Sequence, residues 1–348
     1  MEGVASSTDT CQADVFERWD DLPRHLKIHV LQNLPYPTLR NFMFLSKECF
    51  QLASEIETEA FAVFLHDIAY LKDEDDEDNE YNSMEEGTVE LSVWYIPPHL
   101  RNVPNSFEPY QLLFTRDKSG GCILRRVREE TQHKSYGKEV RYAEETTFAA
   151  ALRSFFQLTK NIKAKELSVE VERLNPDLER ALNQQTTARF SCKTFLIRTE
   201  DRTLPPLLYP FIPAGCSLQV YTFPFPKPDD IFIESSCFDL ELMRAAPMFD
   251  TEANVGVNDE QLPYLRGHRL AMKAPFISSK GVHEILLQWV EGRRRIAEVD
   301  LNQTRNLDKD ETFEGLDEYI LSGSELRDAI GDRLGGPTRG VISRVGIR

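Results

Sequence analysis

The chain has 348 residues, of which 41% are hydrophobic and 28% charged, and its formal net charge is −16. This composition is typical of a folded protein with a sizeable core, and the acidic balance disfavours a direct nucleic-acid partner, which needs clustered positive charge. No apolar run approaches the roughly 18 residues of a membrane-spanning helix, and the N-terminal residues lack a signal-peptide pattern. We therefore expect a protein of the cytoplasm, the nucleus or both, with no membrane partner.

The motifs that would indicate an enzyme are missing. The sequence contains no G-x-G-x-x-G, no G-x-x-x-x-G-K-[ST] and no G-x-S-x-G. His25 and His29 stand four residues apart, as in a zinc protease, but Leu26 occupies the place of the general-base glutamate. The six cysteines form no C-x-x-C pair and are too sparse for a disulfide scaffold. We expect a non-catalytic protein with no metal, no cofactor and reduced, mostly buried thiols.

Helical spacing dominates residues 18–70, which follow an expected disordered N-terminus at 1–17. The first apolar stripe recurs every four residues and comprises Leu22, Leu26, Val30 and Leu34, with Leu31 beside it. Pro23 suits the first turn of this helix, where a missing N–H costs nothing.

Two further helices are expected after Pro35 and Pro37 interrupt the first pattern. The second helix carries Leu39, Phe42 and Leu45 on one face. Ser46 suits the cap of a third helix, whose apolar residues are Cys49, Leu52, Ala53 and Ile56. Later apolar residues from Phe61 to Ile68 extend this predicted helix to about Tyr70.

The segment LPRHLKIHVLQNLPYPTLRNFMFLSKECFQLAS, beginning at Leu22, resembles an F-box. The family's Leu-Pro is Leu22-Pro23, its Ile-Leu is Val30-Leu31, and its later leucines fall on Leu34, Leu39 and Leu52. Its Val-Cys pair falls on Leu45-Ser46. The sequence departs from the pattern where Arg24 and His25 replace an acidic residue, and where Cys49, followed by Phe50, replaces an aromatic one.

The resemblance implies a subunit that docks onto the Skp adaptor of a cullin-RING ubiquitin ligase and holds a protein substrate near the ubiquitin-charged enzyme. Such a subunit acts by proximity and is not itself catalytic. The resemblance and the apolar pattern together predict a set of adaptor-binding residues: Leu22, Pro23, Leu26, Val30, Leu31, Leu34, Leu39, Leu45, Cys49, Phe50 and Leu52.

An acidic linker is expected at 71–86, because nine acidic residues and no Lys or Arg lie between Asp73 and Glu86. We expect a substrate-binding domain at 87–323 and a tail at 324–348. Strands are predicted at 90–96, 111–115 and 122–127, followed by a helix at 145–160.

From there strands and helices alternate. Strand centres are predicted near Leu167, Phe195, Gln219, Glu241, Leu270 and Glu298, with helices at 177–184, 204–211 and 279–291. Steps of 20 to 29 residues with one strand and one helix each are typical of leucine-rich repeats, although the strict consensus is missing. The predicted fold class is therefore α+β, with an N-terminal three-helix F-box followed by an irregular leucine-rich-repeat-like α/β domain with parallel strands. A compact α/β domain is the alternative fold.

This larger part is also similar to the C-terminal domains of nematode-type F-box proteins, the FTH domain and the type 2 F-box-associated domain. The similarity rests on SCKTFLIRT, CSLQVYTF and a final helix and strand containing Trp289 and Gly292. Both families imply a protein target, whose identity and binding surface the sequence leaves unknown. Aromatic residues suited to such a surface are Tyr209, Tyr221, Tyr264 and Trp289. A binding scaffold without a ligase, for example in an RNA-regulatory complex, is the alternative function.

Overall fold

The computed structural model describes residues 19–34, 36–43, 45–68, 84, 87–96, 107–130, 133–136, 139–184, 189–222, 231–237, 239–302 and 307–316. The chain divides into two compact units, Met1–Thr58 and Glu59–Arg348, which are described separately. The expected disordered N-terminus (1–17) and tail (324–348) lie outside the described residues, and so does the expected linker (71–86) apart from Met84.

The first unit contains three described helices, α1 (Arg24–Gln32), α2 (Tyr36–Met43) and α3 (Lys47–Ala53). Their shared core consists of Leu31, Leu39, Leu52, Ala53 and Ile56. The Ser46 hydroxyl caps α3 by accepting a hydrogen bond from the Cys49 N–H at 3.1 Å. Pro23 is the N-cap of α1 and not a residue of its first turn, so the helix begins one residue later than predicted.

The predicted extension of the third helix to Tyr70 is wrong. α3 ends at Ala53, and the next element is a ten-residue strand, β1 (Thr58–Asp67). The apolar spacing of Phe61, Phe64 and Leu65 also fits a strand that is buried on both faces, and backbone pairing with a neighbouring strand decides between the two. The larger unit therefore begins near Glu59, well before the boundary predicted at residue 87.

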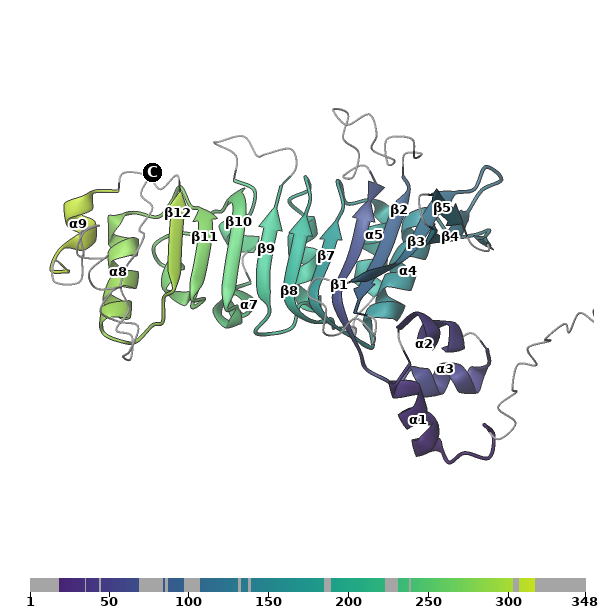
Figure 1. Cartoon of the computed structure of the whole chain (residues 1–348). Helices are drawn as coiled ribbons and strands as arrows, with labels where there is room; N and C mark the ends of the chain where they lie inside the picture. Colours follow the sequence, from purple (N-terminus) through teal and green to yellow (C-terminus); the bar gives the residue numbers. More distant parts are fainter. Residues whose placement is uncertain are drawn as a thin grey trace, which may run out of the picture. The chain divides into compact units, whose positions relative to one another are not determined.

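Twelve described strands form one sheet in the larger unit, in the order β12-β11-β10-β9-β8-β7-β1-β2-β3-β4-β5, with β6 also paired to β4 (Figure 1). The antiparallel part consists of β1, β2 (Val89–Tyr95), β3 (Glu108–Arg116), β4 (Cys122–Glu130), β5 (His133–Tyr136) and β6 (Val140–Tyr142). The strands predicted at 90–96, 111–115 and 122–127 are confirmed, while β5 and β6 had no clear signal in the sequence.

The remaining strands are parallel and follow one another in chain order. They are β7 (Ile162–Glu170), β8 (Ser191–Arg198), β9 (Ser217–Tyr221), β10 (Met248–Asn254), β11 (Arg269–Lys273) and β12 (Glu298–Asn302). Five of the six predicted strand centres lie in these strands. Glu241 does not, because it belongs to a helix that Asp239 caps by accepting from the Leu242 N–H at 3.0 Å.

The described helices of the unit are α4 (Thr147–Thr159), α5 (Pro176–Gln184), α6 (Leu204–Leu208), α7 (Leu240–Ala245), α8 (Ser279–Val290) and α9 (Lys309–Phe313), with short 3-10 turns η4 (Tyr209–Phe211), η5 (Ser235–Cys237) and η6 (Leu262–Tyr264). The helices predicted at 145–160, 177–184 and 279–291 are confirmed, and the one predicted at 204–211 is α6 continued by η4. α4 packs against β2, β3, β4 and β7.

A row of buried apolar side chains crosses the parallel strands in register. It comprises Leu167, Phe195, Leu218, Phe249 and Leu270, each at most 1% exposed. Since side chains alternate between the two faces of a strand, these residues mark the face packed into the core, and their neighbours point to the second face of the sheet. Each strand–helix step therefore repeats the same core position.

Candidate functional site

The first unit exposes apolar side chains beside its buried core. Leu26 and Val30 lie one turn apart on α1 and are 42% and 43% exposed. Leu45, just before α3, is 72% exposed, and Phe50 on α3 is 50% exposed. Leu26 and Val30 therefore form an exposed apolar pair on one face of α1, and an exposed apolar patch is typical of a surface that a partner covers.

The predicted adaptor-binding residues divide into two groups. Leu22 is half-buried and Pro23 exposed, so both are accessible together with Leu26, Val30, Leu45 and Phe50. Leu31, Leu39, Cys49 and Leu52 are instead buried within the unit, and Leu34 packs against its core. These last five residues pack within the unit and hold the three helices together.

A buried lysine in the first unit was not singled out from the sequence. Lys27 is 6% exposed, and its Nζ donates to the Glu48 carboxylate at 2.9 Å. The same Nζ lies 5.6 Å from the centre of the Trp19 ring, which itself meets Phe42 edge-on. Lys27 therefore connects α1 to α3 and to the residues that precede α1. The sequence did not indicate this role, because a lysine is normally expected on an exposed helix face.

The second face of the sheet carries a buried polar cluster where β1, β7 and β8 meet. Glu170 is 7% exposed, and its carboxylate accepts from the Ser168 hydroxyl at 2.9 Å and from Arg198 at 3.2 Å. His66 Nε2 lies 3.4 Å from the same carboxylate. Burial raises the pKa of Glu170, but His66, Arg198 and Ser168 outweigh it, so the pKa lies below the ordinary value for glutamate.

The aromatic residues considered for a target surface lie in different environments. Tyr209 is 4% exposed and belongs to the core, whereas Tyr264 at the end of η6 is 53% exposed. Trp289 in α8 is half-buried. Tyr221 is half-buried on the second face of the sheet, and its hydroxyl donates to Asp250 at 3.3 Å. Burial and the Asp250 charge raise the pKa of Tyr221 to about 12.

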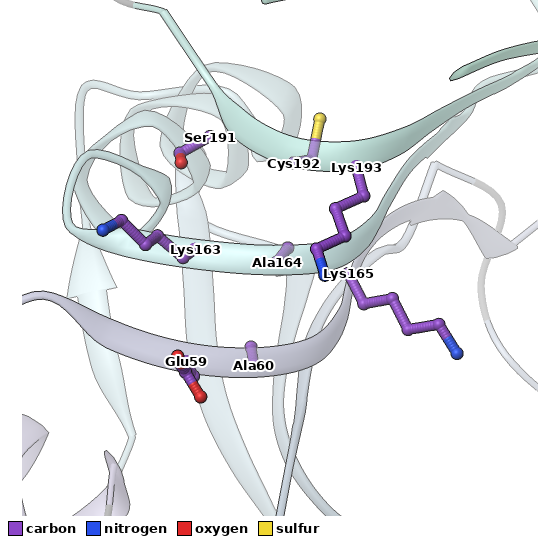
Figure 2. Close-up of a pocket in the computed structure, with 8 residues that line it drawn as sticks. All are labelled: Glu59, Ala60, Lys163, Ala164, Lys165, Ser191, Cys192 and Lys193. Atoms are coloured by element: carbon purple, nitrogen blue, oxygen red, sulfur yellow. The ribbon is translucent and has the colours of Figure 1, made fainter. Parts of the chain in front are cut away.

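A pocket of about 300 Å³ lies at the start of β1, β7 and β8. Three lysines, Lys163, Lys165 and Lys193, line it together with Glu59, Ala60, Ala164, Ser191 and Cys192 (Figure 2). Figure 2 shows Ala60, Ala164 and Cys192 on one side of their strands, with Glu59 and Lys193 on the other. The lysine side chains do not converge on one point, and Lys165 Nζ instead lies 4.9 Å from the centre of the Phe61 ring.

Among the described residues, no three His, Cys, Asp or Glu side chains are grouped as metal ligands. His25 and His29 are exposed on α1. Of the described helices, none has both the length and the apolar character needed to cross a bilayer.

Comparison with known proteins identifies the first unit. Residues 19–57 match the family model of the F-box domain, and this range contains α1, α2, α3 and the core that joins them. No curated protein and no solved structure matches the chain. The chain therefore carries an F-box domain at its N-terminus, joined to a mixed α/β unit with a large sheet.

Proposed function

We propose that the protein is the substrate-recognition subunit of an SCF-type cullin-RING E3 ubiquitin ligase. In this proposal the F-box docks the Skp adaptor, and through it a cullin, while the larger unit holds a protein target. The observation that carries the proposal is the F-box match over 19–57, which coincides with helices that expose apolar side chains. The protein would act without catalysing a reaction itself, in the cytoplasm, the nucleus or both.

The exposed apolar residues of the F-box are the proposed adaptor contacts. Leu22, Pro23, Leu26, Val30, Leu45 and Phe50 are accessible, and burying such side chains against a partner stabilises a complex by roughly 1.5–3 kcal/mol for each fully covered large residue. The F-box core residues contribute indirectly, because they hold the helices in position.

The larger unit is proposed to bind the target. A specific interface needs about 800 Å² on each partner, and an F-box covered by an adaptor has little surface left. In the larger unit the parallel strands follow in chain order and repeat one core position, which supports a leucine-rich-repeat-like character. We propose that this unit is an F-box-associated domain of the nematode FTH or type 2 kind.

Adaptor binding is tested with the full chain and a purified Skp adaptor. The double variant Leu26→Glu, Val30→Glu places two charges in the proposed contact and should weaken binding at least 100-fold. The matched control is His25→Glu, His29→Glu, which adds the same charged side chains to exposed positions of the same helix. Circular dichroism and thermal unfolding verify that both variants fold.

The same experiment separates the ligase role from the alternative of a binding scaffold. If the folded wild-type chain does not bind the adaptor, the ligase proposal is wrong. Binding that both double variants retain would instead show that α1 is not the contact.

A further inference from the structure

Two cysteine side chains lie in contact in the larger unit. Cys192 is the second residue of β8, and Cys216 directly precedes β9. Their sulfur atoms are 3.5 Å apart, although 24 residues separate them in the chain. Among the other described cysteines, Cys49 and Cys122 are buried.

The backbone geometry suits a covalent link between these two sulfurs. β8 and β9 are adjacent parallel strands, and their pairing places Thr194 opposite Ser217. Continuing this register sets Cys216 opposite Lys193, so Cys192 is its diagonal neighbour and not its direct cross-strand partner. A strand spacing of about 4.8 Å combined with one step of about 3.3 Å along the strand gives a Cα separation of about 6 Å, within the range that disulfides span. A disulfide bond measures about 2.05 Å, so the two sulfurs, which lie 3.5 Å apart, need to approach by about 1.5 Å.

We propose that Cys192 and Cys216 form a reversible oxidation site, at which a low-molecular-weight disulfide such as glutathione disulfide converts the two thiols into a disulfide bond. The thiolate of one cysteine attacks a sulfur of the oxidant, forms a mixed disulfide and expels one thiolate. The second cysteine then attacks the first, closes the Cys192–Cys216 bond and expels the second thiolate. The two cysteine sulfurs lose two electrons, the oxidant is reduced to two thiols, and these take up the two protons that the cysteines release.

The order of the two steps follows from accessibility. Cys192 is half-buried and lines the pocket of Figure 2, whereas Cys216 is 1% exposed. The oxidant therefore meets Cys192 first, and Cys216 resolves the mixed disulfide from inside the protein.

Unlike the cysteine of a typical reactive site, whose pKa is lowered, Cys192 has a raised pKa. The hydrogen bond with Cys216 and burial raise the pKa of Cys192, so its thiolate is scarce near neutral pH. Selectivity comes from the neighbouring thiol, which captures the mixed disulfide once it forms. The oxidation rate should therefore rise about tenfold for each pH unit between about 7 and 8.

The test incubates the full chain in buffers of glutathione and glutathione disulfide, followed by acid quenching, alkylation and peptide mass spectrometry. The expected product is a peptide pair linked through Cys192 and Cys216, lighter by about 2 Da than the two reduced peptides. Excess dithiothreitol should restore both thiols. Cys49→Ser is the control, because it removes a buried cysteine and should leave the link intact.

Single variants distinguish the two roles. Cys216→Ser should stop the reaction at a glutathione mixed disulfide on Cys192. Cys192→Ser should leave Cys216 reduced in the folded protein, since that thiol is buried. A stable mixed disulfide on Cys192 in the wild-type chain would overturn the proposal, as would a failure to form the link in oxidising buffer. Adaptor binding is not involved, so the result stands apart from the proposed ligase role.

Discussion

His66 of β1 and Glu170 of β7 lie 3.4 Å apart between Nε2 and the carboxylate, at the point where the antiparallel part of the sheet meets the parallel part. Ser168 and Arg198 donate to the same carboxylate, so one buried acid joins three strands. The charge of Glu170 is therefore part of the structure that holds the two parts of the sheet together.

Glu170→Gln should lower the free energy of unfolding by about 1–3 kcal/mol at pH 7, because it removes a buried, hydrogen-bonded charge. The pKa of Glu170 is lowered in the folded state, so its contribution is fully present above the unfolded value of about 4.3 and is lost as pH falls through the folded value. Urea unfolding at several pH values should show wild type and variant converging below about pH 4.

The matched control for this variant is Glu179→Gln, which makes the same chemical change at an exposed position of α5. It should change stability by less than about 0.5 kcal/mol. A Glu170→Gln protein as stable as the control at pH 7 would contradict the role assigned to this acid.

The position of β1 predicts where the larger unit can be separated. β1 lies between β7 and β2, so a fragment that begins at residue 87 lacks a central strand and exposes the edges of both neighbours. Residues 57–348 should be soluble and unfold cooperatively, whereas residues 87–348 should aggregate. Size-exclusion chromatography and circular dichroism make the comparison, and equal behaviour of the two fragments would show that β1 is dispensable.

The two groups of F-box leucines should respond differently to truncation. Leu52 is completely buried, so Leu52→Ala should destabilise the unit by about 2–5 kcal/mol. Leu26→Ala removes a side chain that is 42% exposed and should change stability by less than about 1 kcal/mol while weakening adaptor binding. Thermal unfolding and adaptor titration measure the two effects. Leu26→Ala with full adaptor affinity would argue against its proposed contact.

Gly281, in the first turn of α8, lies against the side chain of Asp259, which caps the start of that helix. A Cβ at Gly281 would lie 2.2 Å from Asp259 Oδ1. Asp259 accepts hydrogen bonds from the Ser278 N–H at 2.8 Å and the Ser278 hydroxyl at 2.6 Å, at the start of α8. Gly281→Ala should therefore destabilise the protein by about 1–3 kcal/mol, although alanine normally favours a helix over glycine by about 1 kcal/mol.

A double-mutant cycle tests this explanation. In an Asp259→Ala background the carboxylate is absent, so Gly281→Ala should become neutral or stabilising. Equal effects of Gly281→Ala in both backgrounds, measured by urea unfolding, would mean that Asp259 is not the obstacle.

The sequence by itself determined most of the local elements and the F-box. Leu22-Pro23 and the leucines that follow at family spacing identified the domain, because its core positions are close together in the chain. The alternation of strands and helices was also predictable, since a buried residue such as Phe195 or Leu270 belongs to a short apolar run between polar residues.

Long-range contacts decided the rest. Phe61 to Ile68 fits helical spacing, and hydrogen bonding to the neighbouring strands β7 and β2 makes most of this segment a strand. Leu26 is exposed and Leu31 is buried because of the way the three helices of the F-box pack together. Cys192 and Cys216 meet because β8 and β9 pair in parallel, with a helix between them in the chain. These relationships arise from pairing and packing between distant segments, which the periodicity of one segment cannot encode.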